Sequence, residues 1–140
     1  AEWWIALVTP RLRIETKAAR AILPAVWGAK GFIQLMANTA GLMHAFATGD
    51  ADLLRRSLVD VYAEPLRKEL VPHFDDVKSA ALAAGAFGGS LSGSGPTVFA
   101  IAPDEATARR VADVMQRAFA EVASTAHVGP IAREGAREVV

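Results

Sequence analysis

In the first half of the chain, the hydrophobic residues first form one short continuous run and then recur at helical spacing. Residues 3–9 are almost wholly apolar and are bounded by Pro10, a pattern that predicts a buried strand. Residues 16–23 predict a short helix, which Pro24 stops. A longer helix is predicted over 29–48, because six large apolar residues fall close to one of its faces: Phe32, Leu35, Met36, Leu42, Met43 and Phe46.

Capping residues divide the next part of the chain into further helices. Gly49 is placed to end the long helix, and Asp50 to cap a helix over 51–62. The apolar residues of that helix are expected to be buried: Leu54, Leu58 and Val61. Pro65 favours the start of another short helical piece, since proline suits the first helical position. A further helix is predicted over 73–84.

In the last part of the chain, the apolar residues no longer recur at helical spacing throughout but also form short continuous runs. Residues 86–91 and 97–102 are short apolar runs around a glycine-rich segment, which predicts two strands joined by a special loop. Asp104 then caps a strongly amphipathic helix, whose apolar residues recur at three- and four-residue spacing: Ala108, Val111, Val114, Met115, Ala118, Phe119 and Val122. Residues 124–129 predict a last strand. The sum is an α+β fold in which helices pack on a sheet of antiparallel strands.

Composition and charge narrow the function classes. The chain has 140 residues, which fits a single domain over 1–140, and 52% of them are hydrophobic. Its 15 basic residues balance 15 acidic ones, so charge gives no reason to expect nucleic acid or an anionic membrane as partner. With no cysteine, disulfides, thiolate catalysis and Cys-ligated metals are excluded. The three histidines have no metal-binding spacing, and we expect no metal ligands and a cytoplasmic location by default.

The segment 88–97, Gly-Gly-Ser-Leu-Ser-Gly-Ser-Gly-Pro-Thr, carries the most chemical information. Glycines allow positive φ, so successive N–H groups of such a loop can turn inward and bind a phosphate or carboxylate. A plain flexible hairpin is the alternative, although the flanking apolar strands and Pro96 argue for a loop that is held. No Gly-Lys-Ser/Thr follows, which excludes a Walker A loop, and no helix follows as a dinucleotide fingerprint requires.

Two arginines are candidates for binding a carboxylate. Arg20 lies in Thr-Lys-Ala-Ala-Arg-Ala-Ile-Leu-Pro, and Arg67 in Ala-Glu-Pro-Leu-Arg. A guanidinium can hold a carboxylate through a bidentate pair of hydrogen bonds, although arginines on amphipathic helices are usually solvated. Asn38, between apolar residues of the long helix, could also point into a site.

These motifs resemble those of a known family. Leu91–Ala100, Leu-Ser-Gly-Ser-Gly-Pro-Thr-Val-Phe-Ala, resembles the third motif of the GHMP kinase superfamily, and the settings of Arg20 and Arg67 resemble those of homoserine kinases within it. The resemblance implies that Arg20 and Arg67 bind the carboxylate of L-homoserine, with Thr16 beside the substrate. It also implies that the loop lies near the phosphates of ATP through Ser92, Gly93, Ser94, Gly95 and Thr97, and that the fold is ferredoxin-like.

The resemblance covers only half of such a kinase. The family's first motif and its second, glycine- and serine-rich ATP loop do not occur here, and the chain begins at Ala1 rather than at Met. We therefore expect an N-terminal ATP-binding domain outside this chain, an apolar face that packs against it, and no catalytic or metal residue within 1–140. The whole protein would use ATP and Mg²⁺ to make O-phospho-L-homoserine in threonine biosynthesis, and this chain alone would be inactive.

Two other functions stay open at this point. The chain could be a stand-alone regulatory module of ferredoxin-like fold that binds an amino acid or another small anion. It could also belong to a GHMP kinase that acts on a different alcohol, although both arginine settings argue against this. A homodimer is left open.

Overall fold

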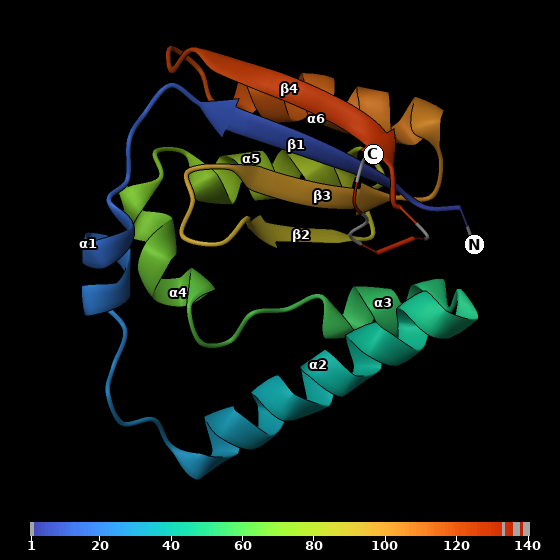
Figure 1. Cartoon of the computed structure of the whole chain (residues 1–140). Coiled ribbons are helices and arrows are strands. Elements are labelled where there is room, and N and C mark those ends of the chain that lie inside the picture. The colour runs from blue at the N-terminus through green and yellow to red at the C-terminus, as the bar shows by residue number, and fades with distance from the viewer. Residues whose placement is uncertain (1, 133, 136–137, 139–140) are drawn as a thin grey trace.

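The computed structural model describes residues 2–132, 134–135 and 138, and these form one four-stranded antiparallel sheet (Figure 1). Its strands are β1 (Trp4–Pro10), β2 (Gly88–Leu91), β3 (Val98–Ala102) and β4 (Ser124–Pro130). The strand order is β2-β3-β1-β4, and every neighbouring pair is antiparallel. With helices between β1 and β2 and between β3 and β4, this is the split βαβ arrangement of ferredoxin-like folds, and the predicted fold class is confirmed.

Helices fill both crossover connections. The first contains α1 (Thr16–Ala21), α2 (Ala29–Thr48), α3 (Ala51–Ser57), α4 (Glu64–Arg67), the 3-10 helix η1 (Lys68–Leu70) and α5 (Phe74–Ala83), and the second contains α6 (Glu105–Ala118). The predicted helices over 29–48, 73–84 and after Asp104 are confirmed. Asp50 and Asp104 cap α3 and α6 as expected, since their carboxylates accept the N–H groups of Leu53 and Thr107 at 2.9 and 2.8 Å.

The sheet separates two apolar cores, because alternate residues of a strand point to opposite faces. On one face, Ala6 and Val8 of β1 pack with α5 and α6, and Met115 and Phe119 are fully buried there. On the other face, Ile101 of β3 packs with residues of α2 and α3. Figure 1 accordingly shows α2 and α3 on the β2 side of the sheet, apart from α5 and α6.

The helix predicted over 51–62 ends five residues early, at Ser57. Leu58 leaves the helical region with ψ of 59°, while its side chain is buried against the second core. The Asp60 carboxylate then accepts the N–H groups of Tyr62 and Ala63, both at 2.8 Å, so these donors bond to a side chain instead of continuing the helix. This turn separates α3 from α4.

The long helix α2 exposes more apolar surface than a single buried face would allow. Phe32, Met36 and Met43 are 55%, 57% and 68% exposed, whereas Asn38 and Ala45 are the buried residues of the helix. The predicted apolar face of α2 is therefore only partly packed: Leu42 lies against the second core, whereas Phe32, Met36 and Met43 are exposed. The exposed side agrees with the expected apolar face, and what covers it stays a prediction.

Candidate functional site

Arg67 joins three segments at one end of the sheet. It is the last residue of α4, and its Nε donates a hydrogen bond to the carbonyl oxygen of Ala19 in α1 at 2.9 Å. Its Nη1 donates to the carbonyl oxygen of Gly93, in the loop between β2 and β3, at 3.2 Å. Figure 1 shows α1 and α4 beside each other at the end of the sheet where this loop turns. The predicted arginine and the predicted loop are therefore in direct contact.

The two bonds leave part of the Arg67 guanidinium available. Nε is engaged, and so is one N–H of Nη1, which fixes the plane of the group. The remaining N–H groups, on Nη1 and Nη2, have no hydrogen-bond partner among the described residues. An anion could thus be bound end-on by these two nitrogens, with the side chain already ordered.

Thr16 and Arg20 occupy the exposed side of α1. They are four residues apart, so they lie on the same face of the helix, one turn from each other. Both are exposed, and among the described residues neither side chain has a hydrogen-bond or ion-pair partner. Ala19, which accepts the bond from Arg67, is fully buried and directly precedes Arg20. The fold therefore brings α1, with Arg20, next to Arg67.

The glycine-rich loop is closed by its own backbone. Ser92 N–H donates to the carbonyl oxygen of Thr97 at 2.8 Å, and Gly95 N–H donates to that of Ser92 at 3.1 Å. Gly93 and Gly95 have φ of 63° and 83°, values that favour glycine. The N–H groups of Gly93 and Ser94 have no acceptor among the described residues, which leaves two adjacent donors for an anion.

Neighbouring side chains pack against the loop and bond to it, which fixes its position. A Cβ added at Gly95 would come within 3.4 and 3.5 Å of the side chains of Ile14 and Val71, so the glycine sits against an apolar wall. The hydroxyl groups of Thr97 and Thr9 are hydrogen-bonded at 2.8 Å, which ties the loop exit to the end of β1. The loop is held rather than free, in agreement with the flanking strands.

Asn38 lies apart from this cluster. Its side-chain amide donates to the carbonyl oxygen of Val59 at 2.7 Å and accepts from Gln34 Nε2 at 2.8 Å. It lines a cavity of about 210 Å³ between α2 and β2, to which Ser90 also contributes. The side chain fixes α2 to the turn before α4, and among the described residues no hydrogen bond joins it to the arginines or the loop.

Three residues outside the predicted set connect α4 to the core. The Glu64 carboxylate accepts hydrogen bonds from Lys78 Nζ of α5 and from Ser90 Oγ of β2, both at 2.6 Å. Glu64 and Ser90 lie within the two motifs that pointed to the site, but nothing in the sequence distinguishes their side chains from solvated ones. Lys78, an ordinary helix lysine in sequence, gives no signal at all.

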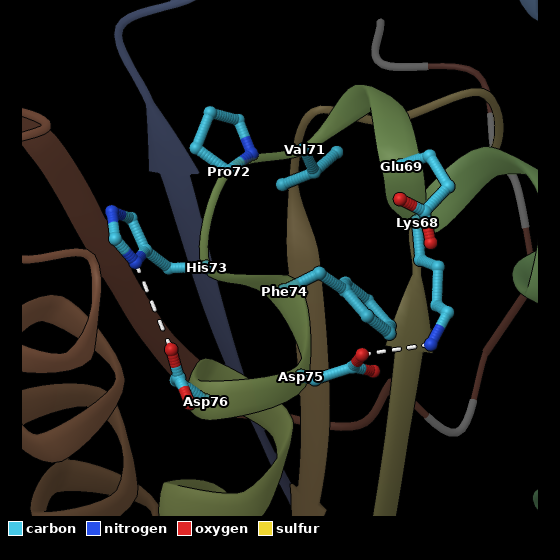
Figure 2. A pocket seen from close by; sticks show the side chains of 8 residues that line it. All are labelled: Lys68, Glu69, Val71, Pro72, His73, Phe74, Asp75 and Asp76. Carbon is cyan, nitrogen blue, oxygen red and sulfur yellow. Dashed lines mark hydrogen bonds and ion pairs between the residues drawn. The ribbon is translucent and has the colours of Figure 1, made fainter.

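A second hollow, of about 330 Å³, lies at η1 and the start of α5 (Figure 2). In it Lys68 Nζ pairs with Asp75 at 2.7 Å, and His73 Nδ1 lies 3.7 Å from the Asp76 carboxylate. The hydrogen bond to Asp75 raises the pKa of Lys68 above its ordinary value. None of the predicted site residues lines this hollow.

Two classes of feature are missing from the part of the chain that the structure covers. No group of three or more His, Cys, Asp or Glu side chains is arranged to hold a metal ion within the described ranges. In the same ranges, no helix has both the length and the apolar character needed to cross a membrane.

Comparison with known proteins gives consistent matches. The family described as GHMP kinases C terminal matches residues 42–121. Homoserine kinase of Chlorobium phaeobacteroides (strain BS1) is 41% identical over 137 residues, which cover 95% of this chain and 43% of that protein. Homoserine kinase of Chlorobaculum tepidum is 43% identical over 135 residues, covering 94% and 42%. The chain thus spans less than half the length of the curated relatives it matches.

Solved structures agree with the sequence matches. The crystal structure of homoserine kinase from Cytophaga hutchinsonii is similar with a TM-score of 0.88 at 36% identity, covering 90% of this chain and 41% of that one. The structure of L. major mevalonate kinase in complex with R-mevalonate has a TM-score of 0.71 at 13% identity, over 91% and 42% of the two chains. At 13% identity, the similarity to mevalonate kinase shows only that the fold is shared.

Proposed function

The chain belongs to the GHMP kinase family as a C-terminal domain, and from this we propose that it is the substrate-holding part of a homoserine kinase. The whole enzyme would transfer the γ-phosphoryl group of ATP to the hydroxyl of L-homoserine. Relatives with the name homoserine kinase at 41% and 43% identity support this substrate over the other alcohols of the family.

One observation carries most of the proposal: Arg67 bonds to both α1 and the glycine-rich loop. A substrate that is an amino acid with a side-chain hydroxyl needs its carboxylate fixed near the phosphoryl donor. Arg67 with Arg20 would bind the carboxylate, and Thr16 would lie on the same side of α1. The free N–H groups of Gly93 and Ser94 would face an oxygen of the transferred phosphoryl group.

In the whole enzyme ATP would supply the phosphoryl group, and Mg²⁺ would neutralise charge that develops during its transfer. The residues described here fit the substrate side of that reaction: they bind an anion and orient it. They contain no cluster of metal ligands in the described ranges, so the Mg²⁺ ligands and the ATP loop would come from an N-terminal part. Asn38 would support the site only indirectly, through the turn that precedes α4.

A coupled ADP-release assay tests the proposal. The intact protein, with the N-terminal part that its relatives have, is assayed with L-homoserine, mevalonate and galactose. We expect phosphorylation of homoserine by the intact protein and no turnover by residues 1–140 alone. Preference for mevalonate or galactose would overturn the substrate, and binding of homoserine without any turnover by the intact protein would favour the regulatory module.

A further inference from the structure

Glu64, at the start of α4, turns its side chain into the protein. Its side chain is 14% exposed, and that of its partner Lys78 is 22% exposed. Both carboxylate oxygens are used, because Oε1 accepts from Lys78 Nζ and Oε2 accepts from Ser90 Oγ. Ser90 is itself buried on β2. A single carboxylate therefore links α4 to a helix and to a strand of the core.

The helix α4 has no packing contacts of its own that would fix its orientation. It has four residues, too few for a ladder of helical hydrogen bonds, and none of its residues is buried. Leu66 is exposed, so the helix has no apolar face that packs on the sheet. Its orientation therefore depends on polar ties: the Asp60 turn before it, Glu64 at its start and Arg67 at its end.

We propose that Glu64 is a positioning residue for Arg67, acting through Lys78 and Ser90. Ser90 lies two residues before the glycine-rich loop, so α4 is fixed to this hairpin at two points. These points are the bond from Ser90 to Glu64 and the bond from Arg67 to Gly93. Together they set the distance between the guanidinium and the loop. The inference rests on the proposed function, since it concerns how the carboxylate of homoserine is aligned with the phosphoryl donor.

A neighbouring ion pair offers a matched control. Lys68 and Asp75 also join the α4–η1 segment to α5, at 2.7 Å. Their side chains are 31% and 71% exposed, and solvent-exposed pairs of this kind contribute little to stability. Replacing Asp75 therefore removes an ion pair between the same two segments, while it leaves the ties of Glu64 in place.

The test uses the intact kinase and the variants Glu64→Gln, Ser90→Ala and Asp75→Asn. We expect Glu64→Gln to lower kcat/KM for homoserine about tenfold or more, because a guanidinium displaced by a fraction of an ångström misaligns the substrate. Ser90→Ala, which removes only the hydrogen bond from Ser90 to Glu64, should lower kcat/KM for homoserine by a smaller factor. Asp75→Asn should stay within about twofold of wild type, and the KM for ATP should not change in any variant.

A substrate analogue without a carboxylate separates positioning from general structural damage. The inhibition constant of 3-aminopropan-1-ol, which is homoserine without its carboxylate, should be the same for wild type and Glu64→Gln. In an Arg67→Ala background, Glu64→Gln should cause no additional loss, because the group it positions is gone. An equal loss for homoserine and the analogue, or full activity of both Glu64→Gln and Ser90→Ala, would overturn the inference.

Failure of the proposed function gives a different result. In that case the wild-type protein itself would not phosphorylate homoserine, and no variant could be compared. If wild type is active and Arg67→Ala is impaired while Glu64→Gln equals wild type, only the positioning role is refuted.

Discussion

Replacing Arg67 with alanine would remove two structural hydrogen bonds and the proposed contact with the substrate. In the structure Nε and Nη1 are occupied by the carbonyl groups of Ala19 and Gly93, and the outer N–H groups are available to a carboxylate. Loss of a hydrogen bond to a charged partner is worth about 1.5–3 kcal/mol. That free energy corresponds to a decrease of roughly ten- to a hundredfold in kcat/KM for homoserine.

The same change has a separate cost in stability. Ala19 is fully buried, so its carbonyl group would lose its donor in a place that water does not readily reach. An unsatisfied buried group costs about 1–3 kcal/mol, whereas the exposed Gly93 can bond to water instead. Thermal unfolding followed by circular dichroism should therefore show a Tm lower by several degrees.

Steady-state kinetics of the intact protein, assayed for the proposed phosphorylation of homoserine, distinguish these two effects. Arg67→Lys keeps the charge but lacks the guanidinium fork, and it should give an intermediate kcat/KM. Arg109→Ala, on the exposed surface of α6, is the control for loss of an arginine and should match wild type. A folded Arg67→Ala enzyme with unchanged kcat/KM for homoserine would remove Arg67 from the site, and so would an equal loss of affinity for 3-aminopropan-1-ol.

Four further variants test the fold itself by urea or thermal unfolding. Gly89→Ala should destabilise the protein by roughly 3 kcal/mol, the upper end for an overpacked core, because its Cβ would overlap the Phe99 carbonyl oxygen of β3. Met115→Ala should cost about 2–5 kcal/mol, since the side chain is fully buried, while Met43→Ala, 68% exposed, should cost less than about 0.5 kcal/mol when residues 1–140 are unfolded by themselves. The cap of α6 lowers the pKa of Asp104, chiefly through the N–H of Thr107, so this carboxylate stabilises the fold above its unfolded-state pKa. The Tm advantage of wild type over Asp104→Asn should therefore be full near neutral pH and disappear as pH falls through the lowered pKa, and a constant difference would contradict this.

Much of the fold could be predicted from local pattern. The α6 helix, its Asp104 cap and the two strands around the glycine-rich loop follow from hydrophobic period and turn residues, which act over a few neighbouring positions. The helix predicted over 51–62 was too long because its end depends on Leu58 entering a core and on Asp60 bonding to the next turn. Neither effect has a signal in helical spacing.

The sequence by itself determined which groups are candidates for the site: two arginines in recognisable settings and a glycine-rich loop between strands, with no thiol. Only the tertiary structure decided how these parts meet, because Arg67 reaches Ala19 and Gly93 across 48 and 26 positions of the chain. The tertiary structure likewise placed Asn38 apart from the loop and revealed Glu64 as the link between α4 and the core. Such contacts depend on packing between distant segments, and no local period encodes them.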